Sequence, residues 1–566
     1  MIKKITVVLI AIIAIVAVIA SVFAIYYKVK IANAPTMQEI AEAHPWTVPN
    51  DWFKTDTITL KGRIEGYDAE KFGFTSMECS YEDVFADEEN TVLVFNINED
   101  GTFCKKFLAR YPVQQVFYTT DSKVSFHSIP FFARPGETID VTVRKGSFGQ
   151  YECVYNNGSS KDAERWLRTS DKLVQQFSPL WYYEGTLEGA NEVAETVWKM
   201  VMARLQELIS DKGYTPMEVQ LALAYAQARF GTDYLGCIDK QASALVNYEK
   251  RDSMGYAEIL DSTEWKKYKD ASNYAPLRHI DFDNPLLFAS QHFFFLQNRI
   301  AFARPVNAYN LVLSFDSFPK ELADRLADLR GFMGDDHDNL MVQLCAYKDF
   351  ALHFHAFCED ASKLVNDNMT DEQKQRFVND WPTLDKVFPL YLDAFKHPYI
   401  RLQAEQYRER KLSPKDLATP LPNTSAAEMI RTLASKYPGK YLFIEFWGTS
   451  CGPCRAAIQQ SKEMRAEIAK RNDVKLIFIA EESTPEGSDD YKDYVAKWLA
   501  GEEAVCVNKA DFSRLQELFG FNGIPHYEVI TPDCRRIRDD LRLHGYDNFA
   551  VQFEKIKENL STTTNK

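Results

Sequence analysis

Phe443-Ile-Glu-Phe-Trp-Gly-Thr-Ser-Cys-Gly-Pro-Cys-Arg455 decides the fold of the C-terminal part of the chain. Its first four residues are typical of a buried strand, and a helical pattern starts at the second cysteine. A Cys-x-x-Cys pair at such a junction puts Cys451 near the helix N-terminus, where partial positive charge and free N–H groups favour the thiolate. Cys454 lies one turn inside, close enough to attack a mixed disulfide. Pro453 suits the first turn because its missing N–H is not needed there.

A zinc site is the alternative reading of this pair. Structural zinc usually needs a second Cys-x-x-Cys or a following pair of histidines. The sequence has no second Cys-x-x-Cys, and His526 and His544 lie far downstream in a different pattern. We therefore predict thiol–disulfide chemistry and no metal at Cys451 and Cys454.

Two further features lie at positions that could serve this pair. Glu445 stands six residues before Cys451 in an otherwise apolar strand. A buried carboxylate there would have a raised pKa and could take the proton of Cys454, although a surface glutamate on an edge strand is the alternative. Pro525, in Gly523-Ile-Pro525, directly precedes the strand pattern His526–Ile530. A proline is tolerated where a strand opens.

These features together resemble the thioredoxin superfamily, in particular the TlpA/ResA-like thiol–disulfide oxidoreductases of bacterial envelopes. The resemblance rests on Glu445, Trp447, the Cys-Gly-Pro-Cys pair and Gly523-Ile-Pro525, and covers about 140 residues. It implies a thioredoxin fold with Pro525 in cis against Cys451. Ser450 departs from the pattern, because thioredoxins usually carry an aromatic residue at that position.

The resemblance also implies a role for each site residue. Cys451 would be the exposed nucleophile, Cys454 the resolving thiol and Glu445 the acidic residue beneath them. Substrate would be bound by Trp447, Gly452, Pro453 and Ile524, the last through its backbone. No cofactor is implied beyond the redox-active disulfide itself.

The N-terminal residues 1–30 are predicted to form a transmembrane anchor. Ile5 to Ile25 contains Thr6 and Ser21 as its polar residues. A helix of this length spans roughly 31 Å, enough to cross the hydrocarbon core. A cleaved signal peptide is the alternative, with cleavage after Ala24 or Ala34. We expect a single-pass protein of the cytoplasmic membrane whose remaining chain lies outside it.

The rest of this multidomain chain falls into three regions. Residues 50–155 show period-two alternation and hairpin signals, which predict a β-sandwich. Residues 160–411 place apolar residues three and four apart, which predicts an all-α region. Residues 424–566 alternate strand and helix patterns, which predicts the α/β thioredoxin-like domain.

Charge and motif together define the expected function. A net charge of −14 argues against nucleic-acid partners and against docking on an anionic lipid surface. We expect an envelope oxidoreductase that reduces disulfides of exported client proteins, with electrons from a membrane thiol donor. The Gly-Pro dipeptide favours this reducing direction, since it resembles thioredoxins near −270 mV rather than DsbA near −120 mV. The alternative is an envelope binding protein whose redox domain is secondary or regulatory.

Overall fold

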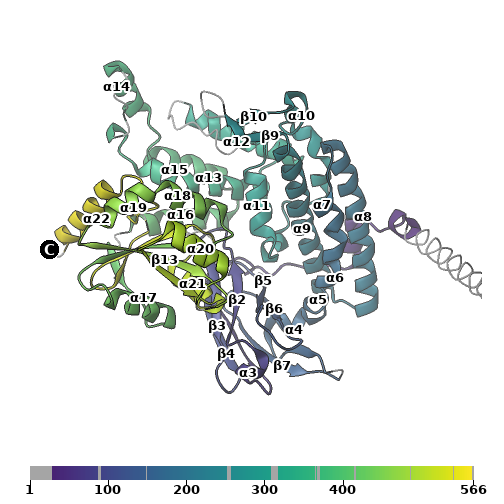
Figure 1. Ribbon diagram of the computed structural model, residues 1–566. Coiled ribbons are helices and arrows are strands. Elements are labelled where there is room, and N and C mark those ends of the chain that lie inside the picture. The colour runs from purple at the N-terminus through teal and green to yellow at the C-terminus, as the bar shows by residue number, and fades with distance from the viewer. Residues whose placement is uncertain are drawn as a thin grey trace, which may run out of the picture.

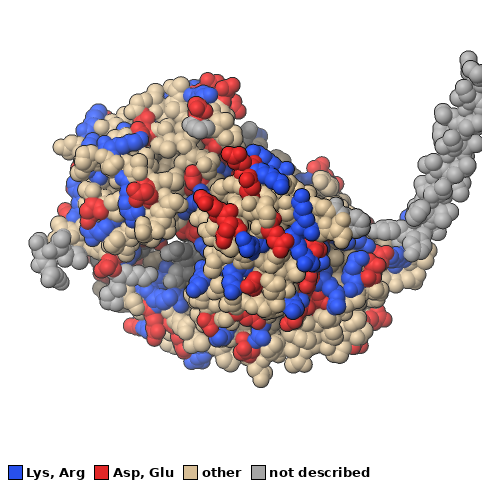
Figure 2. Space-filling view, turned by 90° about the horizontal axis from the view of Figure 1, so that it is seen from below, with Lys and Arg blue, Asp and Glu red and all other residues tan. Residues whose placement is uncertain are grey.

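The computed structural model arranges the chain as a β-sandwich, a helical body and a C-terminal α/β domain that lie against one another (Figure 1). The C-terminal domain carries Cys451 and Cys454 and is called the redox domain below. Residues 28–563 are described, except 87–90, 148, 252–256, 307–316, 364, 366–369, 414–415, 485 and 540. On the face seen in Figure 2, Lys and Arg are interspersed with Asp and Glu over most of the surface.

Two four-stranded sheets form the sandwich. The first has the order β4-β1-β7-β8, in which β1 and β7 are parallel: Thr102–Ala109, Asp56–Ile64, Thr138–Lys145 and Tyr151–Tyr155. The second has the order β3-β2-β5-β6: Thr91–Asn96, Ser76–Tyr81, Val113–Tyr118 and Ser128–Ala133. Aromatic rings join the sheets, as between Phe95 and Phe103, whose centroids are 4.5 Å apart. Buried residues from both sheets thus fill one core.

The helical body is built on three long helices, α8 (Leu187–Lys212), α9 (Pro216–Ser243) and α13 (Leu340–Cys358). Shorter α-helices surround them or lie nearer the sandwich: α2 Met37–Ala43, α3 Ala69–Phe72, α4 Gly158–Asp162, α5 Glu164–Leu167, α6 Asp171–Val174, α7 Ser178–Tyr182, α10 Ser262–Lys267, α11 Phe293–Ala301, α12 Phe318–Met333, α14 Asp371–Asp380, α15 Leu384–Ala394 and α16 Pro398–Leu412. Four 3₁₀ turns complete the described set: η1 Gln175–Phe177, η2 Ala271–His279, η3 Pro285–Ala289 and η5 Ala361–Lys363.

The helical body differs from its prediction in two ways. The region predicted as all-α also holds a short antiparallel ladder, β9 (Val246–Arg251) with β10 (Ala257–Ile259). Its core is also continuous with that of the sandwich. Phe85, just after β2, packs edge-on against Tyr347 of α13 at 5.1 Å. The sandwich and the helices therefore stabilise each other.

The predicted membrane anchor, residues 1–30, lies almost wholly outside the described residues, which begin at Lys28. Within the described part of the chain, no helix is both long enough and apolar enough to cross a membrane. The helix α8 has the length, but it carries acidic and basic residues such as Glu192, Glu195 and Lys199, which are costly in hydrocarbon. The fold class with a transmembrane helix and the single-pass placement in the cytoplasmic membrane are therefore corrected for the described residues, among which no membrane-spanning helix is present.

The redox domain has one six-stranded sheet of order β11-β16-β15-β12-β13-β14. The strands are Ala418–Pro420, Arg535–Ile537, His526–Ile530, Tyr441–Trp447, Val474–Glu481 and Glu503–Val507. The strands β12, β13 and β14 run parallel, and β15 is antiparallel to β12. One face packs on α18 (Gly452–Gln460), α19 (Lys462–Ile468), α20 (Asp489–Trp498) and α22 (Phe549–Thr563); the other packs on α17 (Ser425–Ser435) and α21 (Lys509–Phe519). The strand β12 is thus central and covered on both faces.

The helix predicted to start at Cys454 and run to Lys470 is interrupted at Ser461, which separates α18 from α19. The buried Arg465 accounts for the break in part. Its guanidinium donates to the Ile458 carbonyl at 3.0 Å and to the Ser461 hydroxyl at 3.2 Å. The Arg465 guanidinium thus hydrogen-bonds the residues of the turn at which the helix changes direction.

The helix α21 docks the redox domain on the sandwich beside β3 and β2. Lys509 pairs with Glu78 at 3.1 Å, and Glu517 pairs with Lys105. Arg514 donates two hydrogen bonds to the Asn96 side chain, at 3.1 and 2.8 Å. These contacts fix the orientation of the helix whose C-terminal end leads into the Gly523-Ile-Pro525 loop.

Candidate redox site

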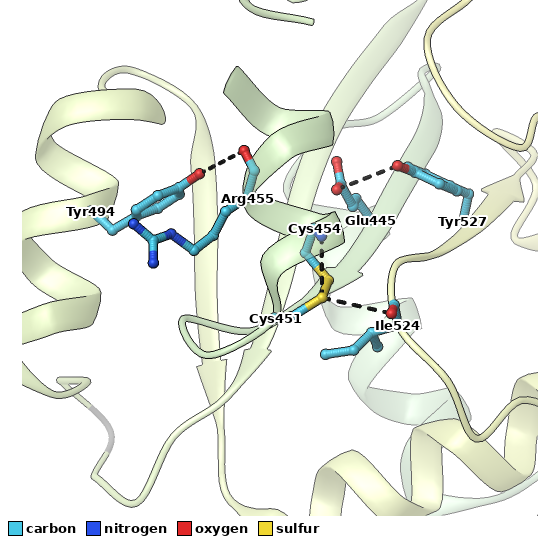
Figure 3. The surroundings of a disulfide bond; sticks show 7 residues. All are labelled: Glu445, Cys451, Cys454, Arg455, Tyr494, Ile524 and Tyr527. Atoms are coloured by element: carbon cyan, nitrogen blue, oxygen red, sulfur yellow. Dashed lines mark hydrogen bonds between the residues drawn. A yellow bond between two sulfur atoms is a disulfide. The ribbon is translucent and has the colours of Figure 1, made fainter. Parts of the chain in front are cut away.

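Cys451 is the N-cap of α18, at the carboxyl end of β12. Its Sγ accepts a hydrogen bond from the Cys454 N–H at 3.1 Å, and a disulfide joins the two residues across a Cα–Cα distance of 5.3 Å (Figure 3). Cys454 is fully buried, whereas Cys451 is partly exposed. An incoming thiol or disulfide can therefore reach Cys451 and not Cys454.

The loop before β15 lies against this pair. The Ile524–Pro525 peptide bond is cis, as the resemblance implied. The Ile524 carbonyl oxygen lies 3.6 Å from Cys451 Sγ. Gly452 and Pro453 are exposed and Ile524 is half-buried, so these three border the accessible sulfur. The fold thus gathers these residues around Cys451.

Trp447 does not join them. Its side chain is 0% exposed and packs against Tyr491 and Tyr494 of α20, with centroids 5.6 and 5.2 Å away. The structure therefore places Trp447 in the core and not beside the accessible sulfur, and its predicted substrate-binding role stays a prediction. The indole instead forms part of the packing beneath the Cys451 loop.

Glu445 lies within the fold below the cysteines, on the same face of β12 as Trp447. Its side chain is 1% exposed, which excludes the alternative of a surface glutamate on an edge strand. The Tyr546 hydroxyl donates to Oε2 at 2.5 Å, and the Tyr527 hydroxyl donates to Oε1 at 3.5 Å. Burial raises the pKa of Glu445 to about 7, although the tyrosine hydrogen bonds and the charge of Arg465 oppose the rise. A carboxyl with this pKa can gain or lose a proton near neutral pH.

Sequence reasoning missed the partners of Glu445. Tyr527, Tyr546 and Arg465 come from β15, from the segment before α22 and from α19. Nothing in their linear spacing from Glu445 marks them as neighbours. A charged residue on the apolar face of a helix was the one available signal, and it applies to Arg465, which is 1% exposed.

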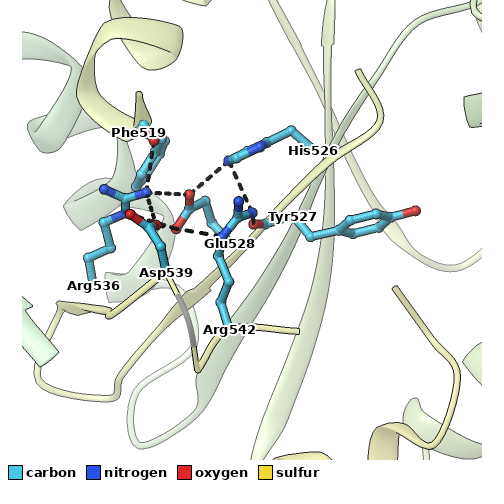
Figure 4. A network of polar contacts seen from close by, with 7 residues as sticks. All are labelled: Phe519, His526, Tyr527, Glu528, Arg536, Asp539 and Arg542. Atoms are coloured by element: carbon cyan, nitrogen blue, oxygen red, sulfur yellow. Dashed lines mark hydrogen bonds and ion pairs between the residues drawn. The ribbon is translucent and has the colours of Figure 1, made fainter. Parts of the chain in front are cut away.

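A buried polar network holds the loop from the opposite face of the sheet (Figure 4). Glu528 of β15 is 0% exposed and accepts from Arg536 at 2.8 and 3.0 Å. His526 lies 2.8 Å from the same carboxylate, and its ring stacks on Phe521 at 4.0 Å. Arg536 also donates to the Phe519 carbonyl at 2.8 Å. The network therefore ties both ends of the loop that carries Ile524.

The other eight cysteines of the described chain are free thiols. Several are buried, and burial raises the pKa of Cys345, for example, to about 12. Such thiols are poor nucleophiles near neutral pH. Among the described residues no group of three or more His, Cys, Asp or Glu side chains is arranged to hold a metal ion.

Comparison with known proteins finds likeness over part of the chain. No family model matches the chain. A protein named Probable nucleoredoxin 1, from Arabidopsis thaliana, is 29% identical over 133 residues, which are 23% of this chain and 22% of that protein. The match thus spans about a fifth of the relative's length.

Solved structures with likeness to the chain include thiol–disulfide oxidoreductases. One is the thioredoxin domain of such an enzyme from Bacteroides vulgatus, 19% identical, with 21% of this chain and 82% of that chain covered and a TM-score of 0.19. Another is a thiol:disulfide interchange protein DsbE from Chlorobium tepidum, which is 17% identical. The match covers 25% of this chain and 93% of that chain, with a TM-score of 0.18. These matches leave most of the chain uncovered.

Glu445→Gln tests the predicted role of this carboxyl. A group with a pKa of about 7 is ionised above that pH, and the ionised form alone can accept a proton. Attack of Cys454 on a mixed disulfide at Cys451 should therefore speed up as pH rises through 7. Glutamine should slow this step ~10²-fold at pH 8 and remove the inflection. Single-turnover rates between pH 5.5 and 9.5 check this, and an unchanged profile would exclude Glu445 as the base.

Proposed function

We propose that this protein is a thiol–disulfide oxidoreductase that reduces disulfide bonds of protein clients through Cys451 and Cys454. The observation that carries the proposal is the Cys451 Sγ, a partly exposed N-cap sulfur that accepts the Cys454 N–H at 3.1 Å. The same N–H and the helix N-terminus stabilise a thiolate at Cys451.

The chemistry takes two displacement steps. The Cys451 thiolate attacks a client disulfide, forms a mixed disulfide and releases one client sulfur as a thiolate. Cys454 then loses its proton to Glu445 and attacks Cys451 Sγ, which closes the Cys451–Cys454 disulfide and releases the second client sulfur. The two client thiolates take up protons, so two electrons have passed from the dithiol to the client.

The enzyme then needs a dithiol reductant to reopen its disulfide. The Gly-Pro dipeptide supports this reducing direction, because it matches the dipeptide of thioredoxins with low potentials. The edge at Ile524 supports protein clients, since a backbone carbonyl beside Cys451 can hydrogen-bond an extended segment that carries the disulfide. The sandwich and the helical body would then recruit or orient the client.

Cys454→Ser is the experiment that tests the proposal. A serine cannot resolve the mixed disulfide, so clients should remain covalently attached at Cys451 and be released by dithiothreitol. Non-reducing electrophoresis and mass spectrometry should find the trapped adducts, and Cys451→Ser/Cys454→Ser should trap none. If Cys454→Ser traps nothing and the wild type reduces no model disulfide such as insulin, the proposal is wrong. A binding protein with a secondary redox domain would then be favoured.

A further inference from the structure

We propose that Tyr546, assisted by Tyr527, is a positioning residue that holds the Glu445 carboxylate ready to receive the Cys454 proton. This inference rests on the proposed function, because it concerns the second step of the same reaction. Figure 3 shows the Glu445 carboxylate between Cys454 on α18 and the Tyr527 hydroxyl. Tyr546 binds the second carboxylate oxygen at 2.5 Å.

The two tyrosines are themselves held in place. Tyr527 is in register with Glu445 across the β12–β15 ladder, so its side chain projects from the same face of the sheet. The ring of Phe443 stacks on Tyr527 at 5.7 Å and meets Tyr546 edge-on at 5.5 Å. Tyr527 and Tyr546 are 7% and 5% exposed. Because the rings cannot swing out to solvent, their hydroxyls stay directed at the carboxylate.

Charged and titratable groups from every neighbouring element act on Glu445. Arg465 of α19 favours the ionised form, and Glu502, which pairs with Arg465, disfavours it. The remaining titratable neighbours are Cys454 of α18 and three tyrosines whose pKa is raised by burial, namely Tyr494 of α20, Tyr527 and Tyr546. Tyr546 makes the shorter of the two tyrosine hydrogen bonds, so its hydroxyl contributes most among the neutral groups.

The Tyr546 hydroxyl matters because a buried carboxylate is destabilised when it has no hydrogen-bond donor. Burial alone raises the pKa of Glu445, and the tyrosine donors bring it back toward neutrality. Without the Tyr546 donor, the pKa should rise by about one further pH unit. Glu445 would then be mostly protonated at pH 7 and could not accept the proton from Cys454 Sγ. The attack that breaks the bond between Cys451 and the client would slow for that reason.

Tyr546→Phe tests the inference in the full-length chain, with the exposed Cys104 and Cys358 replaced by serine. The reduced protein is mixed with 5,5′-dithiobis(2-nitrobenzoate). Cys451 releases a first nitrothiobenzoate at a rate that depends on reagent concentration. Cys454 then releases a second nitrothiobenzoate at a rate that is independent of reagent concentration. The rate of this second phase is measured from pH 5.5 to 9.5.

We expect Tyr546→Phe to move the inflection of the second phase from near pH 7 to about pH 8. The rate at pH 7 should fall about fivefold and recover to the wild-type value near pH 9.5. Tyr437→Phe is the matched control, because Tyr437 hydrogen-bonds the Glu503 carboxylate elsewhere in the same domain. Tyr527→Phe, which removes the longer bond, should shift the inflection less.

The outcomes separate this inference from the proposed function. If the wild type shows no concentration-independent second phase, the two-step exchange itself is wrong. If the wild type shows it and Tyr546→Phe has an unmoved inflection, the positioning role alone is overturned. A rate loss in Tyr546→Phe that is equal at every pH would overturn it too, because it indicates structural damage and not a changed proton affinity.

Discussion

Replacing Cys451 by serine should abolish catalytic disulfide reduction, with a loss of at least ~10³-fold in turnover. Cys451 is the accessible sulfur of the pair, and Cys454 is 0% exposed and cannot meet a client directly. A serine hydroxyl is not ionised near neutral pH and forms no disulfide. Insulin reduction with dithiothreitol as electron donor, corrected for the uncatalysed rate, measures the effect.

The control for this prediction is Cys506→Ser in the same domain. Cys506 lies on β14, and burial raises the pKa of its thiol, so it should not attack disulfides at neutral pH. We expect turnover of Cys506→Ser to stay within about twofold of the wild type. Residual activity of Cys451→Ser above a tenth of the wild type would mean that another thiol is the nucleophile.

Replacing Arg325 by alanine should destabilise the helical body by about 3–5 kcal/mol. Arg325 of α12 and Asp349 of α13 are 5% and 2% exposed, and Arg325 Nε lies 2.9 Å from Asp349 Oδ2. Arg325 also donates to the carbonyls of Val306 and Ala301, at 2.6 and 2.8 Å. Its removal leaves a buried carboxylate and two buried carbonyls without that donor. Urea unfolding followed by far-UV circular dichroism measures the change in free energy.

Two further variants sharpen the stability test. Lys320→Ala removes an exposed ion pair with Asp324 on the same helix, and it should cost less than about 1 kcal/mol. The double variant Arg325→Met/Asp349→Leu should recover much of the lost stability, because apolar pairs can replace buried ion pairs. Equal losses for Arg325→Ala and Lys320→Ala would contradict the explanation.

Much of the redox domain was predictable because its longer elements carry their own periodicity. The strand His526–Ile530 has the predicted bounds, and Thr424 caps α17 by accepting from the Ala427 N–H at 3.2 Å. The strands β11, β14 and β16 were missed; β11 and β16 have three residues each, too few to show a clear alternation. For Arg535–Ile537 the two arginines also hide the strand, as Arg536 is drawn inward by Glu528.

The candidate site divides in the same way. Cys451, Cys454, Glu445 and Pro525 could be predicted because their spacing reflects a local strand–loop–helix path or a strand that follows a loop. The hydrogen-bond donors to the Glu445 carboxylate could not be predicted, because Tyr527 and Tyr546 reach it only after the sheet and the last helix have assembled. The continuity of the sandwich and helical cores depends likewise on contacts such as Phe85 with Tyr347, which are remote in sequence.

The docking of α21 on the sandwich has a consequence for how clients meet the redox pair. A domain on a flexible linker can move through a volume whose size depends on the linker length. The linker length therefore sets the effective concentration of that domain at a client. Here Lys509, Arg514 and Glu517 anchor the helix to β-strands of another domain. The sulfur of Cys451 is therefore held at a fixed position relative to the sandwich. Encounter rates should follow client diffusion and orientation, and lengthening the connection between α16 and β11 should change them little.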